Sequence, residues 1–233
     1  MKRIALSFSG GKDSTLALHK LLNDSNYEVS ELFCTASEEY KRISMHGVRV
    51  ELLQKQAESI GIPLKIIWLP SEPSDECYKE TMAKACKEFK EKGINHIAFG
   101  DICLNDVKEY REAMLNKVNM QAIFPLWEMD TDKVLDEFLT LGYKTIITCV
   151  DLNVLTKDHA GKVIDENFLE SLPQNVDICG ENGEYHTFVF EGPIFRNKVS
   201  YEIVGDKLIE YEIKCPITKE DLQVKLYYAD LAS

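Results

Sequence analysis

An α/β fold with a parallel sheet is predicted by the alternation of strand-like and helix-like segments through the first half of the chain. Short apolar runs occupy residues 4–8, 31–37, 64–69 and 96–99, and they have the length of buried strands. Between them, apolar residues recur at helical spacing. Tyr78, Met82 and Phe89 are one such set, which we interpret as the core face of a helix. Strands that alternate with helices are joined by right-handed crossovers and lie parallel.

A second, smaller domain of α+β type is predicted after the parallel sheet. The sequence changes in texture over residues 119–127, and we place the boundary so that the first domain spans 1–122 and the second 123–233. In the second domain a helix is expected over 130–141 and a strand over 145–150. Residues 198–214 and 222–228 alternate apolar and polar side chains, which predicts antiparallel strands.

The composition indicates a soluble, cytoplasmic enzyme. The chain has 233 residues, of which 45% are hydrophobic, enough for a sizeable core. The apolar run near the N-terminus is short and interrupted by serines, so neither a signal peptide nor a membrane span is expected. Seven cysteines without a Cys-x-x-Cys pair indicate reduced thiols rather than disulfides or a zinc site. The net charge of −12 argues against a large nucleic-acid surface and leaves room for a local basic groove.

An anion-binding loop is predicted between the first strand and the first helix. Its residues are Ser9, Gly10, Gly11, Lys12, Asp13 and Ser14. The two glycines allow a sharp turn and a close approach to a ligand, and the free N–H groups at the start of the next helix attract anions. A lysine at the positive end of a helix is unfavourable unless an anion neutralises it. We therefore expect phosphate at this loop rather than an ordinary capped helix.

The loop does not match the Walker A pattern, because Leu6 and Asp13 stand where that pattern needs Gly and Ser or Thr. The sequence Ser-Gly-Gly-Lys-Asp-Ser instead resembles the PP-loop of the ATP pyrophosphatases. This resemblance implies that ATP is cleaved between its α- and β-phosphates, and that a nitrogen or sulfur nucleophile attacks the resulting adenylate. It also implies that adenine binds at the end of the second strand, which makes Cys34 and Thr35 candidates. The alternative for both is a strand end that merely leads into a loop.

Further candidates follow other strands, at the edge where open parallel sheets bind ligands. Gly100 and Asp101 end the fourth strand, and Asp101 can hold magnesium or the nucleotide, or simply cap the next helix. His46 and Arg49 lie in the loop after the second strand and are candidate ligands, or solvated surface groups. Arg111 can clamp a carboxylate or phosphate bidentately, or pair with a neighbour on its own helix.

A second polar motif, Cys-Gly-Glu-Asn-Gly-Glu-Tyr-His-Thr, occupies residues 179–187. If the chain is extended from Asn182, then Asn182, Glu184 and His186 share one face, and Tyr185 and Thr187 share the other. A carboxylate and an imidazole at that spacing can orient and deprotonate an incoming amine. Because such a pair on a strand edge is commonly just solvated, the pattern alone is weak evidence.

Taken together, the loop and this motif resemble the diphthine–ammonia ligase family, also called the ATP-binding domain 4 proteins. Blocks at residues 100–102, 110–111, 124–127 and 191–193 resemble that family too, so the similarity covers nearly the whole chain. The resemblance implies a Rossmann-like, HUP-type N-terminal domain (adenine nucleotide α-hydrolase-like) and a C-terminal domain that forms the acceptor site. The block at residues 44–49 is more similar to the uncharacterised prokaryotic branch, so diphthine is not assumed to be the acceptor.

The resemblance implies an ATP-dependent ligase like those of diphthamide biosynthesis, in which ATP adenylates a carboxylate and ammonia displaces AMP to leave an amide. Its partners would be ammonia and a protein or small-molecule carboxylate. The implied catalytic residues are Lys12, Asp13, Asp101, Glu184 and His186, with magnesium on Asp13 and Asp101. The implied acceptor contacts are His46, Arg49, Arg111, Glu181, Asn182, Gly183, Glu184, Tyr185, His186 and Thr187.

Two other functions compete with this interpretation. A tRNA-modifying PP-loop enzyme would share the first domain, but it would need a placed catalytic cysteine and a basic RNA-binding module. A nucleotide sensor would bind ATP without turning it over, and would not require the second polar motif. The sequence leaves open the source of ammonia and whether the chain forms a homo-oligomer.

Overall fold

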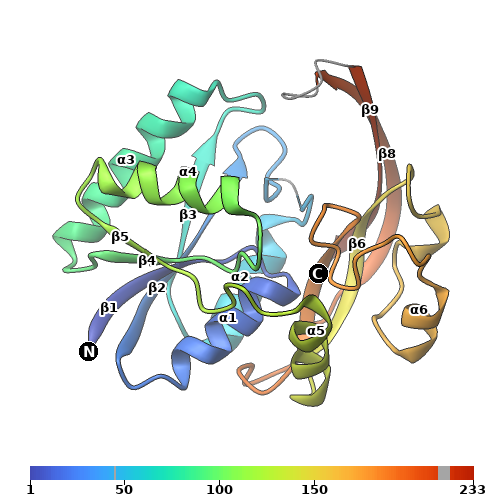
Figure 1. Cartoon of the computed structure of the whole chain (residues 1–233), viewed down its shortest axis with the longest axis horizontal. Coiled ribbons are helices and arrows are strands. Elements are labelled where there is room, and N and C mark those ends of the chain that lie inside the picture. Colours follow the sequence, from blue (N-terminus) through green and yellow to red (C-terminus); the bar gives the residue numbers. More distant parts are fainter. Residues whose placement is uncertain (45, 215–220) are drawn as a thin grey trace.

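The strands form two separate sheets, which stand side by side (Figure 1). The computed structural model describes residues 1–44, 46–214 and 221–233. Within them, a five-stranded sheet has the order β3-β2-β1-β4-β5 and a four-stranded sheet the order β7-β6-β9-β8. Every pairing in the first sheet is parallel, and every pairing in the second is antiparallel. The predicted α/β class, with a parallel sheet followed by an α+β part, is confirmed.

The first sheet uses the first half of the chain. Its strands are β1 (Lys2–Ser7), β2 (Tyr27–Ser37), β3 (Leu64–Leu69), β4 (His96–Ala98) and β5 (Gln121–Ile123). Its helices are α1 (Lys12–Leu22), α2 (Val50–Ile60), α3 (Asp75–Glu91) and α4 (Asn105–Asn116). Four of the strands lie where the apolar runs predicted them. The short β5 lies where the change in texture suggested a boundary, because three residues are too few to show a periodic pattern.

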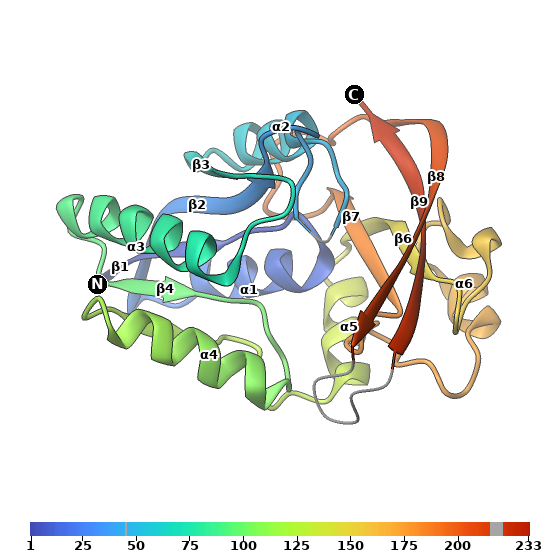
Figure 2. The same ribbon diagram turned by 90° about the horizontal axis from the view of Figure 1, so that it is seen from above.

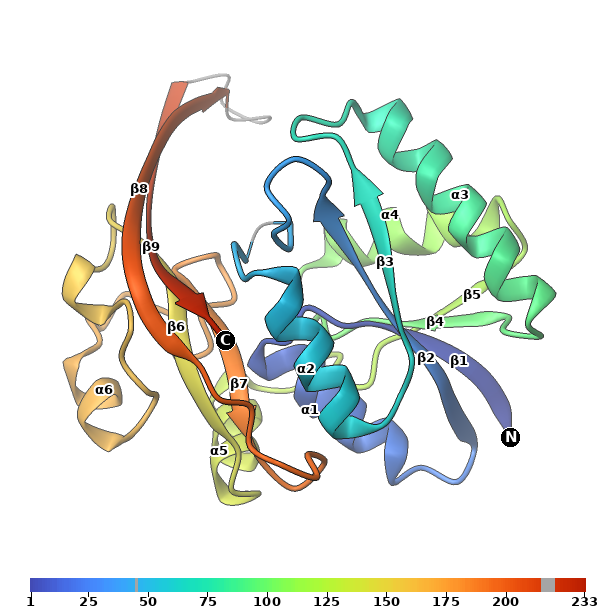
Figure 3. The same cartoon turned by 180° about the vertical axis from the view of Figure 1, so that it is seen from behind.

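The direction of the crossovers places the ligand crevice. From β1 the chain steps through α1 and α2 to β2 and β3, and it then returns through α3 and α4 to β4 and β5 on the other side of β1. Right-handed crossovers in opposite directions put the two helix pairs on opposite faces of the sheet (Figures 2 and 3). Strand order therefore reverses between β1 and β4, and open sheets bind ligands at the carboxyl ends of such a pair.

The second sheet is built from the rest of the chain. Its strands are β6 (Lys144–Asp151), β7 (Tyr185–Glu191), β8 (Glu202–Lys214) and β9 (Asp221–Ala232). The helices of this part are α5 (Thr131–Thr140), the short 3₁₀ helix η1 (Lys157–His159) and α6 (Glu166–Ser171). The predicted helix at 130–141, the strand at 145–150 and the two terminal strands are confirmed, with small shifts at their ends. Cys215 and Met45 lie outside the described residues.

The two sheets share one hydrophobic core. Leu6 and Leu16 of the first sheet and α1 belong to the same buried cluster as Phe138 of α5 and Phe188 of β7. A second cluster, which includes Phe89, fills the opposite face of the first sheet beneath α3 and α4. The division into 1–122 and 123–233 stays a prediction. In the described part of the chain, no helix combines the length and the apolar character needed to span a membrane.

Candidate functional site

Both predicted motifs line a single cavity of about 520 Å³. It lies at the carboxyl ends of β1, β2 and β4, where β7 of the second sheet approaches them. The predicted site residues in its wall are Ser9, Gly11, Lys12, Asp13, Ser14, Cys34, Thr35, His46, Gly100, Asp101, Arg111, Glu181, Gly183, Tyr185, His186 and Thr187. The structure therefore brings together residues from six separate stretches of sequence.

The loop at residues 9–14 turns as its glycines predict. Gly10 has a φ of +79°, in the left-handed region that favours glycine. A Cβ atom there would also collide with the side chains of Gln56 and Leu53. Helix α1 then begins at Lys12 without a side-chain cap from Gly11. The start of α1 thus faces the cavity, and its positive end is suited to an anion.

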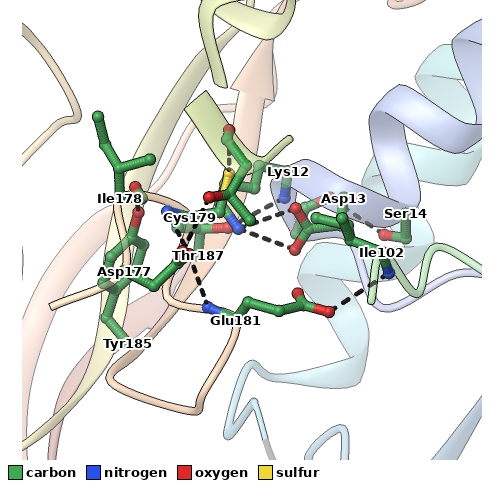
Figure 4. A network of polar contacts seen from close by, with 12 residues as sticks. Lys12, Asp13, Ser14, Ile102, Asp177, Ile178, Cys179, Glu181, Tyr185 and Thr187 are labelled. Carbon is green, nitrogen blue, oxygen red and sulfur yellow. Dashed lines mark hydrogen bonds and ion pairs between the residues drawn. The ribbon is translucent and has the colours of Figure 1, made fainter. Parts of the chain in front are cut away.

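Lys12 is buried beside a carboxylate rather than exposed at the end of its helix. Only 4% of the residue is accessible, and its Nζ lies 2.8 and 2.9 Å from the two carboxylate oxygens of Asp13 (Figure 4). Burial alone would lower the pKa of Lys12, but Asp13 and the nearby Tyr185 and Cys179 outweigh it and raise that pKa. Lys12 is therefore a permanent cation in the cavity wall.

A second ion pair lies in the cavity wall, after β4. Arg111 of α4 contacts the two oxygens of Asp101 at 2.7 and 3.1 Å, and its guanidinium stacks 4.2 Å from the ring centroid of Phe99. Asp101 therefore binds Arg111 across the strand end. Gly100 allows β4 to meet α1, because a Cβ atom there would lie 2.9 Å from the backbone nitrogen of Ser14.

His46, from the loop between β2 and α2, and His186 of β7 meet in the cavity. Their ring centroids are 4.6 Å apart. Burial, together with the positive charge of Lys12, lowers the pKa of His186 to about 4. Burial also lowers the pKa of His46, with His186 and Lys12 acting in the same direction. Both rings are therefore neutral near pH 7, and a neutral imidazole can accept a proton.

The expectation that the chain is extended from Asn182 is wrong. Strand β7 begins at Tyr185, and Gly183 before it adopts a φ of +88°, which is incompatible with a strand. Glu184 consequently points away from the cavity lining into the preceding loop. Its carboxylate is buried and accepts hydrogen bonds from the N–H of Asp177 at 3.0 Å, the N–H of Asn182 at 2.9 Å and the Asn182 amide at 3.1 Å.

Two other predicted ligands have structural partners. Arg49 lies outside the main cavity, where its guanidinium donates to both carboxylate oxygens of Asp230 at 3.1 and 2.8 Å. It borders a separate hollow of about 420 Å³. Glu181 does line the main cavity, and its Oε1 accepts from the N–H groups of Ile102 at 3.3 Å and Cys103 at 3.4 Å (Figure 4 shows the Ile102 bond). Glu181 thus joins the second motif to the loop after β4.

Comparison with known families assigns the chain. Residues 1–122 match the family model described as the diphthamide synthase N-terminal domain, and residues 130–226 match that of the diphthamide synthase C-terminal domain. The chain belongs to the diphthamide synthase family. Two curated relatives are similar over most of their length. A diphthine–ammonia ligase of Mus musculus is 30% identical over 226 residues, and one of Bos taurus is 29% identical over 220; each match covers 84% of this chain and 82% of the relative.

Among solved structures, this chain is similar to NcsA, a U34-tRNA thiolase from Methanococcus maripaludis that was solved with its 4Fe-4S cluster. The TM-score is 0.38 at 22% sequence identity, and the match covers 61% of this chain and 58% of the thiolase chain.

One wall of the cavity was not predicted from the sequence. It is apolar and aromatic, and it consists of Phe33, Leu69, Tyr78, Met82 and Phe99. The assignment of Met82 to the core is correct, since the residue is 3% exposed, but Met82 and Tyr78 also face the cavity. The available signal was position, because Phe33 on β2 and Phe99 directly after β4 lie on the two strands that flank β1, toward the carboxyl ends where open sheets bind ligands.

Proposed function

We propose that this member of the diphthamide synthase family is an ATP-dependent ligase. It would adenylate a substrate carboxylate with release of pyrophosphate, and ammonia would then displace AMP to leave an amide. One observation carries this proposal: the loop that suits phosphate and the motif that suits an amine nucleophile line the same cavity. The similarity to relatives named diphthine–ammonia ligase supports it.

The cavity has the two chemical ends that ATP needs. The apolar wall that includes Phe33 and Tyr78 suits a purine ring, while Lys12 and the N-terminus of α1 suit the phosphates. Asp13 and Asp101 both face the cavity and carry the carboxylate oxygens that magnesium prefers, usually one or two alongside substrate phosphates. Magnesium held there would neutralise negative charge on the phosphates.

In the first half-reaction, an oxygen of the acceptor carboxylate attacks the α-phosphorus and the bond to pyrophosphate breaks. Negative charge grows on the α-phosphate oxygens and on the leaving group. The Lys12 ammonium is fixed in the cavity wall by Asp13, so it is in place before charge develops and does not have to reorganise. Lys12 would therefore lower the barrier to adenylate formation.

In the second half-reaction, ammonia attacks the acyl carbon and the carbon–oxygen bond to AMP breaks. The nitrogen must then lose a proton. His186 is the candidate base that accepts this proton, because its lowered pKa keeps the imidazole neutral. The ring of His46, whose pKa is also lowered, lies 4.6 Å away between ring centroids. Glu184 would act indirectly, by holding the loop before β7 in shape.

Phosphorus NMR on the purified protein tests the proposal. The sample would contain ATP, magnesium, ammonium and a carboxylate source, either a diphthine-bearing protein or a pool of small acids and proteins from a lysate. AMP and pyrophosphate in the wild type, lost in Lys12→Ala, would support the ligase. ADP and phosphate would contradict it. ATP that binds but stays intact with every acceptor would favour a sensor, and turnover that depends on added tRNA would favour a tRNA-modifying enzyme.

A further inference from the structure

A residue of the second sheet caps the start of α1. Gly11 supplies no side-chain cap, yet the N–H of Lys12 donates to the hydroxyl oxygen of Thr187 at 3.0 Å, across 175 residues of sequence. Thr187 belongs to β7 and is 3% exposed. Figure 4 shows its side chain beside Lys12 and Asp13. This bond joins the two sheets at the helix end where an anion is expected.

Backbone contacts hold the same junction together. The N–H of Val189 donates to the carbonyl of Gly10 at 2.9 Å, and the Gln56 amide donates to the carbonyls of both residues. Gly11 makes the close approach possible, because a Cβ atom there would lie 3.1 Å from the Thr187 carbonyl oxygen and 3.2 Å from its hydroxyl. Gly11 has a φ of −84°, so glycine is needed here for space and not for backbone conformation.

The Thr187 hydroxyl has a second hydrogen-bonding capacity. A hydroxyl accepts hydrogen bonds and also donates one. Its oxygen is used by Lys12, which leaves its own hydrogen for a further acceptor, and Thr187 lines the cavity. We propose that Thr187 holds the phosphate loop in its ATP-binding shape and donates its hydroxyl hydrogen to a phosphate oxygen of ATP. This inference rests on the proposed function, because it requires ATP at the loop.

The same residue would connect the two half-reactions. Thr187 is adjacent in β7 to His186, which faces His46. A phosphate that engages Thr187 therefore fixes the segment of β7 that carries the imidazole. Binding of ATP and the position of the proposed base would depend on one hydrogen-bonded contact between the sheets.

Binding measurements on four variants test this role. ATP, pyrophosphate and adenosine would be titrated calorimetrically into the full chain. Thr187→Val keeps the shape of the side chain and removes the hydroxyl, so we expect ATP and pyrophosphate to bind about 10- to 100-fold more weakly, the usual effect of a lost hydrogen bond to a charged group. Adenosine binding should not change. Thr187→Ser should bind ATP within about threefold of the wild type, because it keeps the hydroxyl.

Thr145→Val is the matched control. Thr145 is a fully buried threonine of the same sheet, and among the described residues its hydroxyl has no hydrogen-bond partner, so ATP binding should be unaffected. Gly11→Ala approaches the same contact from the other side and should weaken ATP binding in the same way, which covers the case in which Thr187→Val does not fold.

The outcomes separate this inference from the proposed function. A folded Thr187→Val protein that binds ATP like the wild type would overturn the inference alone. An equal loss of ATP and adenosine binding would also overturn it, because that pattern indicates a purely structural role. A wild-type chain that binds no ATP would overturn the proposed function, and the inference with it.

Discussion

Arg49 donates two hydrogen bonds to Asp230, at 3.1 and 2.8 Å, although 181 residues separate them. Arg42 contacts the same carboxylate at 2.9 Å and donates to the carbonyl of Gly47 at 2.8 Å. The loop held in this way carries His46 into the main cavity. Asp230, on the last strand, therefore fixes the position of a proposed site residue from outside the site.

Asp230→Asn should impair amide formation more than ATP binding. Removing the negative charge frees both guanidinium groups and loosens the loop that holds His46. We expect the rate of product formation to fall by about 10- to 100-fold, as when a catalytic group is displaced by about an ångström, with the ATP dissociation constant nearly unchanged. Glu51→Gln is the control, because Glu51 lies 3.9 Å from Arg49 and does not take part in the contacts of Arg42 and Arg49 with Asp230. Equal losses in ATP binding and product formation would contradict this division.

Glu184→Ala should destabilise the fold. Three hydrogen bonds to a buried carboxylate hold the loop before β7, and removing it takes this acceptor from the N–H groups of Asp177 and Asn182. We expect a loss of about 2–3 kcal/mol in the free energy of unfolding, measured by urea denaturation. Glu191→Ala, which removes a partly exposed carboxylate paired with Lys144, should cost less than about 1 kcal/mol. Similar losses in the two variants would show that the Glu184 contacts do not hold the loop.

Acid should destabilise the protein partly through His186. Its pKa is about 4 in the folded state, mainly because of burial, against an ordinary value of 6.5 for histidine. Below the higher value the unfolded chain binds a proton that the folded chain does not, so stability falls as the pH drops from about 6.5 to about 4. The contribution is at most about 3 kcal/mol. Urea unfolding between pH 7 and 4.5 should show a shallower loss in His186→Asn, and identical slopes would contradict the lowered pKa.

Removal of magnesium should test whether Asp101 is a ligand of the proposed magnesium ion. We expect wild-type ATP binding to weaken by about tenfold or more in EDTA, because magnesium neutralises negative charge on the phosphates. In Asp101→Asn the difference in ATP affinity between magnesium and EDTA should be smaller. Asp106→Asn, in the first turn of α4, is the control and should keep it. An unchanged difference in Asp101→Asn would exclude Asp101 as a magnesium ligand.

The sequence alone was sufficient for the features that depend on local chemistry. The turn at Gly10 and the helix that starts at Lys12 depend on neighbouring residues, so the order of strand, loop and helix could be predicted from the sequence. Asp101 could be placed near them because the carboxyl ends of parallel strands share one edge. The alternation of strands and helices likewise predicted the parallel sheet.

The tertiary structure alone decided which side chains act on which. Glu184 was predicted to face the cavity, but the left-handed turn at Gly183 directs it into a loop whose N–H groups need an acceptor. Arg49 was predicted to bind a ligand, but Asp230 neutralises it. The contact between Lys12 and Thr187 exists because two sheets pack against each other, and sequence patterns report the periodicity of each segment but not the packing between distant ones.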